Sequence, residues 1–197
     1  MSYLDHLSKD KKLARILPAE PLRLQKKKAL HLHLCGSIMS QQLSTKVAAV
    51  IWQRFLDLYD GKEPAPADIL ATDATVLRAI GLSNAKVNYV QNVARFAIEE
   101  GMEWKLLAAM SDEEVITYLT RIKGIGRWTT EMLLMFALGR EDVFAIDDFG
   151  IQQAMTRLYK LDASDKKEFR QKLLKISAKW APYRTYACLH LWYWKDN

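Results

Sequence analysis

Hydrophobic residues recur along the 197-residue chain at intervals of three and four, and no segment alternates between apolar and polar residues. This spacing is typical of helices with one buried face, whereas strands have a period of two. Glycines and prolines separate the apolar segments, so each segment is expected to form its own helix. The sequence therefore predicts an all-α fold.

Capping and stop signals divide these segments into individual helices. Ser44, Ser83 and Ser111 each precede an apolar segment, and Ser111 with Glu114 has the pattern of a capping box. The predicted helices are 21–40, 44–60, 72–80, 83–100, 111–122, 127–138, 148–160, 165–178 and 183–194. The second helix is expected to bury Val47, Val50, Ile51, Phe55 and Leu58. Residues 63–66, which read Glu-Pro-Ala-Pro, are expected to form a rigid loop.

Charge is unevenly distributed along the chain, whose formal net charge is +6. Residues 1–30 carry eight Lys or Arg against three Asp or Glu, and residues 151–197 carry ten against four. Two basic ends around an acidic middle favour a lobe that is formed by both ends and faces a polyanion, with nucleic acid the leading candidate. The alternative is that these charges only solvate helix surfaces.

Composition excludes several classes of protein. No uncharged apolar run reaches the ~18 residues of a membrane span, and the first residues lack the apolar core of a secretion signal. We therefore expect no membrane partner, and a location in a bacterial cytoplasm, with the nucleoid, or in a nucleus. Cys35 and Cys188 are too few for an iron–sulfur cluster or a four-thiolate zinc site. His31 and His33 lie too close in sequence to form the i, i+4 pair of a helical metal site. We expect no cofactor and no metal centre.

The turn Lys123-Gly124-Ile125-Gly126 lies between two predicted helices. Glycines lack a Cβ atom, so the backbone N–H groups of this turn and the start of the next helix can approach an anion closely. A DNA phosphate fits such a site, and the contact would be independent of base sequence. The alternative is a plain tight corner between two helices.

The turn belongs to one of several sequence motifs that follow one another along the chain. They are G-S-I-M-S-Q-Q-L-S from residue 36, I-K-G-I-G-R-W-T from 122, V-F-A-I-D-D-F-G-I from 143 and W-A-P-Y-R-T-Y-A-C-L-H-L-W from 180. The chain resembles the helix-hairpin-helix (HhH-GPD) DNA glycosylase superfamily, and within it the alkylpurine branch typified by 3-methyladenine DNA glycosylase II. The resemblance implies a two-lobed all-α fold with the active site between the lobes. One domain, 1–197, is expected, with lobe 1 at about 45–144, including the hairpin 112–138, and lobe 2 formed by about 1–44 plus 145–197.

Asp148 falls at the superfamily's catalytic aspartate, and Asp147 falls at a less constrained position before it. Without the resemblance, carboxylates at a helix start are interpreted as N-cap residues. An ionised carboxylate suits base excision, because breaking the bond between sugar and base develops positive charge on the sugar. The resemblance implies that Asp148 stabilises this charge and orients or deprotonates a water molecule.

Trp128 stands where the strand-cleaving members of the superfamily keep a lysine nucleophile, so the resemblance implies a monofunctional enzyme. Trp128 and Trp192 match aromatic positions of the base pocket, Met132 replaces a tyrosine of the larger bacterial relative, and His33 is assigned to the same pocket. Aromatic faces attract cations, which suits cationic N3-methyladenine and N7-methylguanine. The remaining tryptophans that we expect in the core are Trp52, Trp104, Trp180 and Trp194.

The DNA contacts implied by the resemblance lie in two loops. Gln42 is expected to fill the gap that the flipped nucleotide leaves, although a solvent-exposed loop glutamine is the alternative. Phosphate contacts are assigned to Lys123, Gly124, Gly126 and Thr129, and the hairpin carbonyls are expected to accept a monovalent cation.

The sequence thus predicts a monomeric DNA glycosylase that removes alkylated purines from double-stranded DNA by hydrolysis and initiates base excision repair. A glycosylase for oxidised or mismatched bases is one alternative. A helix-hairpin-helix module that binds DNA without catalysis is another, but such a module needs no acid after the hairpin.

Overall fold

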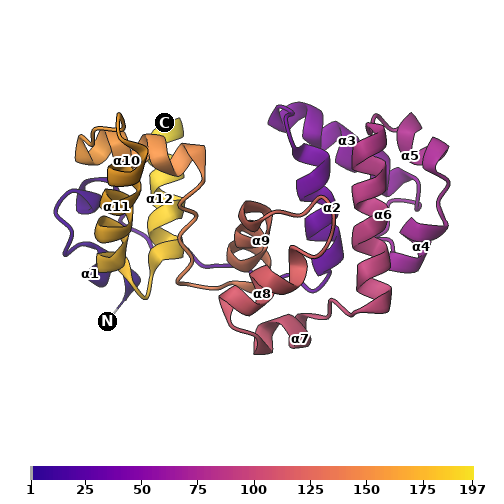
Figure 1. Ribbon diagram of the computed structural model, residues 1–197, viewed down its shortest axis with the longest axis horizontal. Helices are drawn as coiled ribbons and strands as arrows, with labels where there is room; N and C mark the ends of the chain where they lie inside the picture. The colour runs from indigo at the N-terminus through magenta and orange to yellow at the C-terminus, as the bar shows by residue number, and fades with distance from the viewer. Residues whose placement is uncertain (1) are drawn as a thin grey trace. The chain divides into compact units, whose positions relative to one another are not determined.

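The computed structural model describes residues 2–197, and all regular structure in this range is helical (Figure 1). The chain divides into two compact units. One unit contains the two ends of the chain, up to Gln25 and from Leu134 to Asn197, and we call it the terminal unit. The other, Lys26–Leu133, we call the central unit. No helix in the described range is long and apolar enough to cross a membrane.

The central unit is built around α6 (Asn84–Glu99), which packs against α2 (Leu30–Ser40) and α4 (Pro66–Ala71). Its other helices are α3 (Thr45–Asp57), α5 (Ala74–Ala79), α7 (Trp104–Ala109), α8 (Asp112–Leu119) and α9 (Arg127–Leu133). Leu34 and Ile38 of α2 are fully buried, as is Val90 of α6. The unit therefore has an apolar core of its own.

In the terminal unit, α10 (Phe149–Tyr159) packs against α12 (Arg184–Asp196). The other elements are α1 (Tyr3–Leu7), α11 (Lys166–Ser177), 3₁₀ turns at Leu13–Ile16 and Ala178–Trp180, and a π-helical turn at Leu134–Leu138. Asp10 fixes the amino-terminal segment, because its Oδ2 accepts hydrogen bonds from Tyr159 Oη at 2.7 Å and Trp180 Nε1 at 3.1 Å.

The N-caps predicted from the sequence are confirmed. The Oγ atoms of Ser44, Ser83 and Ser111 each accept a hydrogen bond from the third backbone N–H of the following helix, and Ser111 with Glu114 forms the predicted capping box. The sequence did not predict α1, α4 or α7, and α4 begins at Pro66, inside the expected rigid loop. These helices have only five or six residues, too few to establish a helical period.

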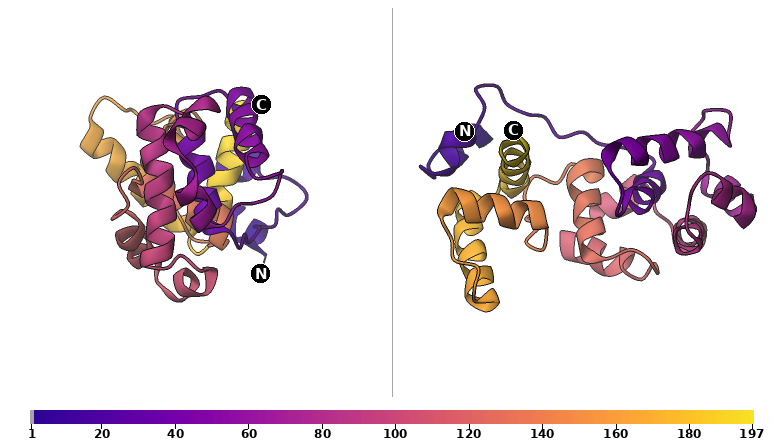
Figure 2. Two further views of the ribbon diagram at one scale, coloured as in Figure 1. Left: turned by 90° about the vertical axis from the view of Figure 1, so that its right-hand side faces the viewer. Right: turned by 90° about the horizontal axis from the view of Figure 1, so that it is seen from above.

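The first predicted helix, 21–40, is wrong in its first half. α2 begins only at Leu30, and residues 17–29 contain no helical turn (Figure 2). Buried positions begin at Leu30, where the helix packs against α6. Packing of an apolar face supplies most helix stability in proteins, so the helix starts where the packing starts.

The predicted buried face of α3 is too wide. Ile51 and Phe55 are buried, whereas Val47, Val50 and Leu58 are 46%, 45% and 36% exposed. α3 packs mainly against α2, and a single neighbouring helix covers only a narrow stripe of its surface.

The lobe boundaries expected from the sequence, about 45–144, differ from the observed central unit, 26–133. α2 contacts α3, α6 and α9, and these contacts place it in the central unit. The segment after Leu133 is held by α12 instead, since Thr185 Oγ1 donates to the carbonyl of Arg140 at 2.7 Å and accepts from the N–H of Val143 at 3.0 Å.

Candidate active site and nucleic-acid interface

Asp148 lies at the start of α10 as its N-cap. Its Oδ1 accepts two hydrogen bonds of 2.8 Å, from the N–H of Ile151 and from Nε1 of Trp192 on α12. The first bond satisfies a backbone donor that has no partner inside the helix, and the positive end of the helix dipole favours a negative charge at this position. The carboxylate is therefore held in one orientation from two sides, while its residue stays partly exposed.

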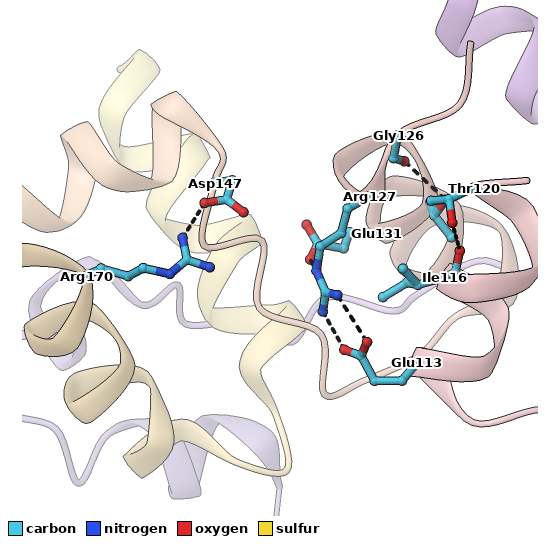
Figure 3. A network of polar contacts seen from close by, with 9 residues as sticks. Glu113, Ile116, Thr120, Gly126, Arg127, Glu131, Asp147 and Arg170 are labelled. Atoms are coloured by element: carbon cyan, nitrogen blue, oxygen red, sulfur yellow. Dashed lines mark hydrogen bonds and ion pairs between the residues drawn. The ribbon is translucent and has the colours of Figure 1, made fainter. Parts of the chain in front are cut away.

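Asp147 has a different environment from its neighbour. Its carboxylate forms an ion pair with Arg170 of α11, and the side chains of both residues are 51% exposed (Figure 3). An exposed ion pair of this kind contributes little to stability. Of the two adjacent acids, only Asp148 is oriented by a helix start and an indole, as its assignment as the catalytic residue requires.

Trp192 is surrounded by features that the sequence did not single out. Its ring stacks on Phe136 of the π-helical turn, with 6.0 Å between centroids. Gly150 lies against its indole edge, and Phe149 is 71% exposed beside Asp148. An exposed aromatic ring next to a carboxylate is a second candidate surface for a base, and its position inside D-D-F-G-I could have indicated it. No sequence signal pointed to Phe136.

The hairpin between α8 and α9 has two glycines with different roles. Gly124 has φ +106°, and a Cβ atom there would lie 2.3 Å from Cγ of Tyr89 on α6. Gly126 has no heavy atom within 4 Å of its Cβ position and is exposed. Glycine at 124 is therefore required by packing against α6, whereas glycine at 126 keeps a surface open for close approach of a ligand.

A three-membered ion cluster links the two helices of the hairpin. Arg127 at the start of α9 pairs with Glu113 of α8 and, at 3.0 Å, with the buried Glu131 one turn along (Figure 3). The paired Glu113 carboxylate raises the pKa of Arg127. The side chains of α8 and α9 are therefore joined to each other as well as through the turn.

Two assigned phosphate contacts differ in accessibility. Lys123 is exposed on the turn, and its carbonyl accepts a hydrogen bond from Nδ2 of Asn92 at 3.3 Å. Thr129 is only 3% exposed. The phosphate contact assigned to Thr129 stays a prediction.

The pocket residues of the central unit lie on α9 and α2. Trp128 is 41% exposed, and Met132 on the same helix is buried. His33 hydrogen-bonds the backbone of Met132, and it lines a cavity of about 690 Å³ together with Trp52. Burial, followed by the nearby Lys27, lowers the pKa of His33 to about 4, although the bond to Met132 opposes this. His33 is therefore neutral at pH 7. Trp52, expected in the core, lines this cavity, whereas Trp180 is fully buried as expected.

Gln42 lies exposed in the loop between α2 and α3, with φ +60°. A left-handed backbone is unusual for glutamine and needs support from its surroundings. Lys86 of α6 supplies it, because its Nζ donates to the carbonyls of Met39 at 3.0 Å and Gln41 at 2.7 Å. The sequence did not indicate Lys86, which is 45 positions from Gln41.

Metal-binding features are few in the part of the chain that the structure describes. No three His, Cys, Asp or Glu side chains in this range converge as metal ligands. Nε2 of His31 lies within hydrogen-bonding distance of the carbonyl of Pro64, at 3.0 Å. Cys35 and Cys188 are buried outside any disulfide, and burial raises the pKa of the Cys35 thiol to about 12.

Within the hairpin, the carbonyls of Lys123 and Gly126 already accept hydrogen bonds from Asn92 and Thr130. The cation expected at the hairpin carbonyls therefore stays a prediction.

Comparisons with known proteins agree on one family. Residues 35–179 match the model of the HhH-GPD superfamily base excision DNA repair protein family. DNA-3-methyladenine glycosylase 1 of Schizosaccharomyces pombe is 38% identical over 174 residues, which are 87% of this chain and 75% of that protein. A putative DNA-3-methyladenine glycosylase of Bacillus subtilis is 34% identical over 161 residues, or 79% of this chain and 55% of that protein.

A solved structure leads to the same family. The 3-methyladenine DNA glycosylase of Schizosaccharomyces pombe, in complex with abasic DNA, superposes with a TM-score of 0.86 at 34% identity. The match covers 100% of this chain and 98% of that chain. The hairpin, the aspartate at the start of α10 and these similarities lead to one conclusion: the chain belongs to the HhH-GPD superfamily of base excision DNA repair proteins.

Proposed function

We propose that the protein is a monofunctional DNA glycosylase that flips alkylated purines of the 3-methyladenine and 7-methylguanine type out of duplex DNA and hydrolyses the bond between base and sugar. The observation that carries the proposal is Asp148, whose carboxylate is fixed by the first turn of α10 and by Trp192. The relatives named 3-methyladenine glycosylases support the substrate class.

In this proposal Asp148 stabilises the positive charge that develops on the sugar as the base leaves. At ~4 Å and an effective dielectric constant of ~20, this attraction is about 4 kcal/mol, or roughly a thousandfold in rate. The same carboxylate can orient or deprotonate the attacking water.

The substrate class follows from charge and leaving-group chemistry. A base methylated at N3 or N7 is cationic, so it leaves without a general acid, and aromatic faces attract it. We assign this attraction to the aromatic faces of Trp128, which is 41% exposed on α9, and of Trp192 on α12. The neutral His33 adds no positive charge that would repel the substrate.

The reaction leaves the DNA strand intact. Trp128 stands where a strand-cleaving enzyme keeps its nucleophilic lysine, and an indole forms no Schiff base with the sugar. The product is an abasic site in duplex DNA.

DNA binding is assigned to the hairpin and to the Gln42 loop. The backbone of Gly124 and Gly126, with Lys123, holds phosphates without reading sequence. Gln42 fills the gap in the stack and offsets part of the few kcal/mol that base flipping costs. The enzyme acts as a monomer on genomic DNA, in a nucleoid or a nucleus.

Duplexes that carry one defined lesion each test the substrate class. We expect the protein to release 3-methyladenine or 7-methylguanine at least tenfold faster than 8-oxoguanine or a mismatched normal base. Faster release of the oxidised or mismatched bases would favour the alternative glycosylase. Tight DNA binding without release of any base would favour the non-catalytic module.

A further inference from the structure

Gly150 is the second residue of α10, two positions after Asp148, and no backbone conformation requires glycine there. It is absent from the residues with positive φ, so any L-residue fits the backbone. Glycine inside a helix is unfavourable relative to alanine, because it loses more backbone entropy on folding. The reason for glycine at this position must therefore lie in its surroundings.

Those surroundings are the two partners of one hydrogen bond. A Cβ atom on Gly150 would lie 3.1 Å from Oδ1 of Asp148 and 3.1 Å from both Cδ1 and Nε1 of Trp192. The bond between that Oδ1 and that Nε1 is 2.8 Å long. The missing side chain leaves the space in which indole and carboxylate meet.

Neither partner can retreat without cost. Oδ1 of Asp148 is also bound by the N–H of Ile151, which ties the carboxylate to the helix start. The indole of Trp192 stacks on Phe136 on another side. A methyl group at position 150 would therefore lengthen the bond between Trp192 and Asp148 rather than find free space.

We infer that Gly150 is a positioning residue for Asp148: its lack of a side chain lets Trp192 close over the first turn of α10 and fix the orientation of the carboxylate by hydrogen bonding. The inference rests on the proposed function, in which Asp148 is the catalytic carboxylate. Trp192 accordingly has two tasks, one as a wall of the base pocket and one as the hydrogen-bond donor that orients the acid.

The variant Gly150→Ala tests this inference through a combination of readouts that a purely structural role does not produce. The single-turnover rate of 7-methylguanine release should fall at least tenfold. The affinity for the lesion duplex should stay within about twofold. The melting temperature should change by no more than about 4 °C, because the helix propensity that alanine adds offsets part of the cost of the lengthened bond. Gln153→Ala is the matched control. It places the same side chain on an exposed position of the same helix, α10, and its rate should be unchanged.

A second variant asks whether Gly150 acts through the hydrogen bond. Trp192→Phe keeps a ring but removes the N–H donor, and it should slow base release as well. Because the same bond cannot be lost twice, Gly150→Ala in the Trp192→Phe background should change the rate less than about twofold.

The indole N–H signals of the six tryptophans in an ¹H–¹⁵N spectrum report the bond without any activity. Trp192→Phe assigns the Trp192 signal, which should shift in Asp148→Asn and in Gly150→Ala but stay in place in Gln153→Ala. A wild type that releases no alkylpurine would refute the proposed function, while this signal would still decide the role of Gly150. The inference is overturned if Gly150→Ala keeps the wild-type rate and signal, if its losses add to those of Trp192→Phe, or if it lowers the melting temperature and affinity together.

Discussion

At the scale of single residues, Asp147 and Asp148 show how environment separates two identical side chains. Asp147 forms an exposed ion pair with Arg170, whereas Asp148 caps α10 and accepts the indole N–H of Trp192. A family pattern selects Asp148 from the sequence. The structure distinguishes the two carboxylates, because only that of Asp148 is held by a helix start and an indole.

Asp148→Asn should reduce base release by two to three orders of magnitude, because the charge is lost while the volume is kept; the charge is worth about 4 kcal/mol. DNA binding should be unchanged or tighter. Asp147→Asn, the matched control, should lose far less, since it only breaks a surface ion pair. Single-turnover rates on one lesion duplex make the comparison. The reverse order of the two variants would shift the catalytic assignment by one residue.

His190 makes stability depend on pH. It is 2% exposed on α12 and stacks on Tyr3, and burial lowers its pKa to about 4. In the unfolded chain the ordinary value is about 6.5, so between these values the unfolded state binds more protons. The contribution of neutral His190 to the free energy of unfolding is therefore fully present above about pH 6.5, and it is lost as the pH falls towards 4.

Unfolding by urea at pH 7, 5.5 and 4.5 should show this loss, by up to about 3 kcal/mol from His190. His190→Phe keeps an aromatic ring against Tyr3 but cannot be protonated, so its stability should fall less steeply over the same range. Parallel curves for the variant and the wild type would assign the acid sensitivity to other groups, among them His33.

At the scale of elements, local signals were readable from the sequence and distant contacts were not. Ser44, Ser83 and Ser111 cap helices through residues that lie three positions on, so their spacing was sufficient. The start of α2 depends on packing against α6, and the sequence placed it nine residues too early. The bond between Asp148 and Trp192 spans 44 positions, and no sequence pattern predicts it.

The two hairpin glycines should respond differently to alanine. Gly124→Ala places a Cβ against the ring of Tyr89 at a positive φ, so it should lower stability by about 2 kcal/mol or more and weaken DNA binding with it. Gly126→Ala should leave the melting temperature unchanged but weaken binding to damaged and undamaged duplex alike. Melting curves and binding isotherms test the pair. A Gly126 variant that loses only its lesion preference would mean that the turn reads the base.

The loop of Gln42 should depend on Lys86. Lys86→Met removes the ammonium group that holds the carbonyls of Met39 and Gln41, so the wedge should be less well placed. Base release from a fully paired duplex should fall about tenfold, because flipping costs a few kcal/mol there, and much less from a lesion that is already unpaired. Lys105→Met, which removes the same charge from α7 of the same unit, is the control. An equal loss of base release on both substrates would show that Lys86 does not assist base flipping.

At the scale of the whole molecule, charge distribution sets how the protein meets DNA. Lys and Arg exceed Asp and Glu in both end segments, and the contacts assigned to the hairpin are with phosphates. Binding of undamaged duplex should therefore weaken by about 10- to 1,000-fold between roughly 50 and 200 mM salt, as counterion release requires. Titrations at several salt concentrations measure the slope, and an affinity independent of salt would contradict phosphate binding.

The central claim is that Asp148 drives hydrolysis of an alkylpurine from a strand that stays intact. The most direct measurement is one single-turnover reaction on a duplex with one 7-methylguanine, analysed for free base and for strand length before and after alkali, with borohydride present in a parallel sample. We predict free 7-methylguanine, a full-length strand that breaks only in alkali, and no trapped adduct. With Asp148→Asn, release of 7-methylguanine should be slower by two to three orders of magnitude. A strand cut before alkali, with an adduct that disappears in Lys123→Ala, would contradict the account.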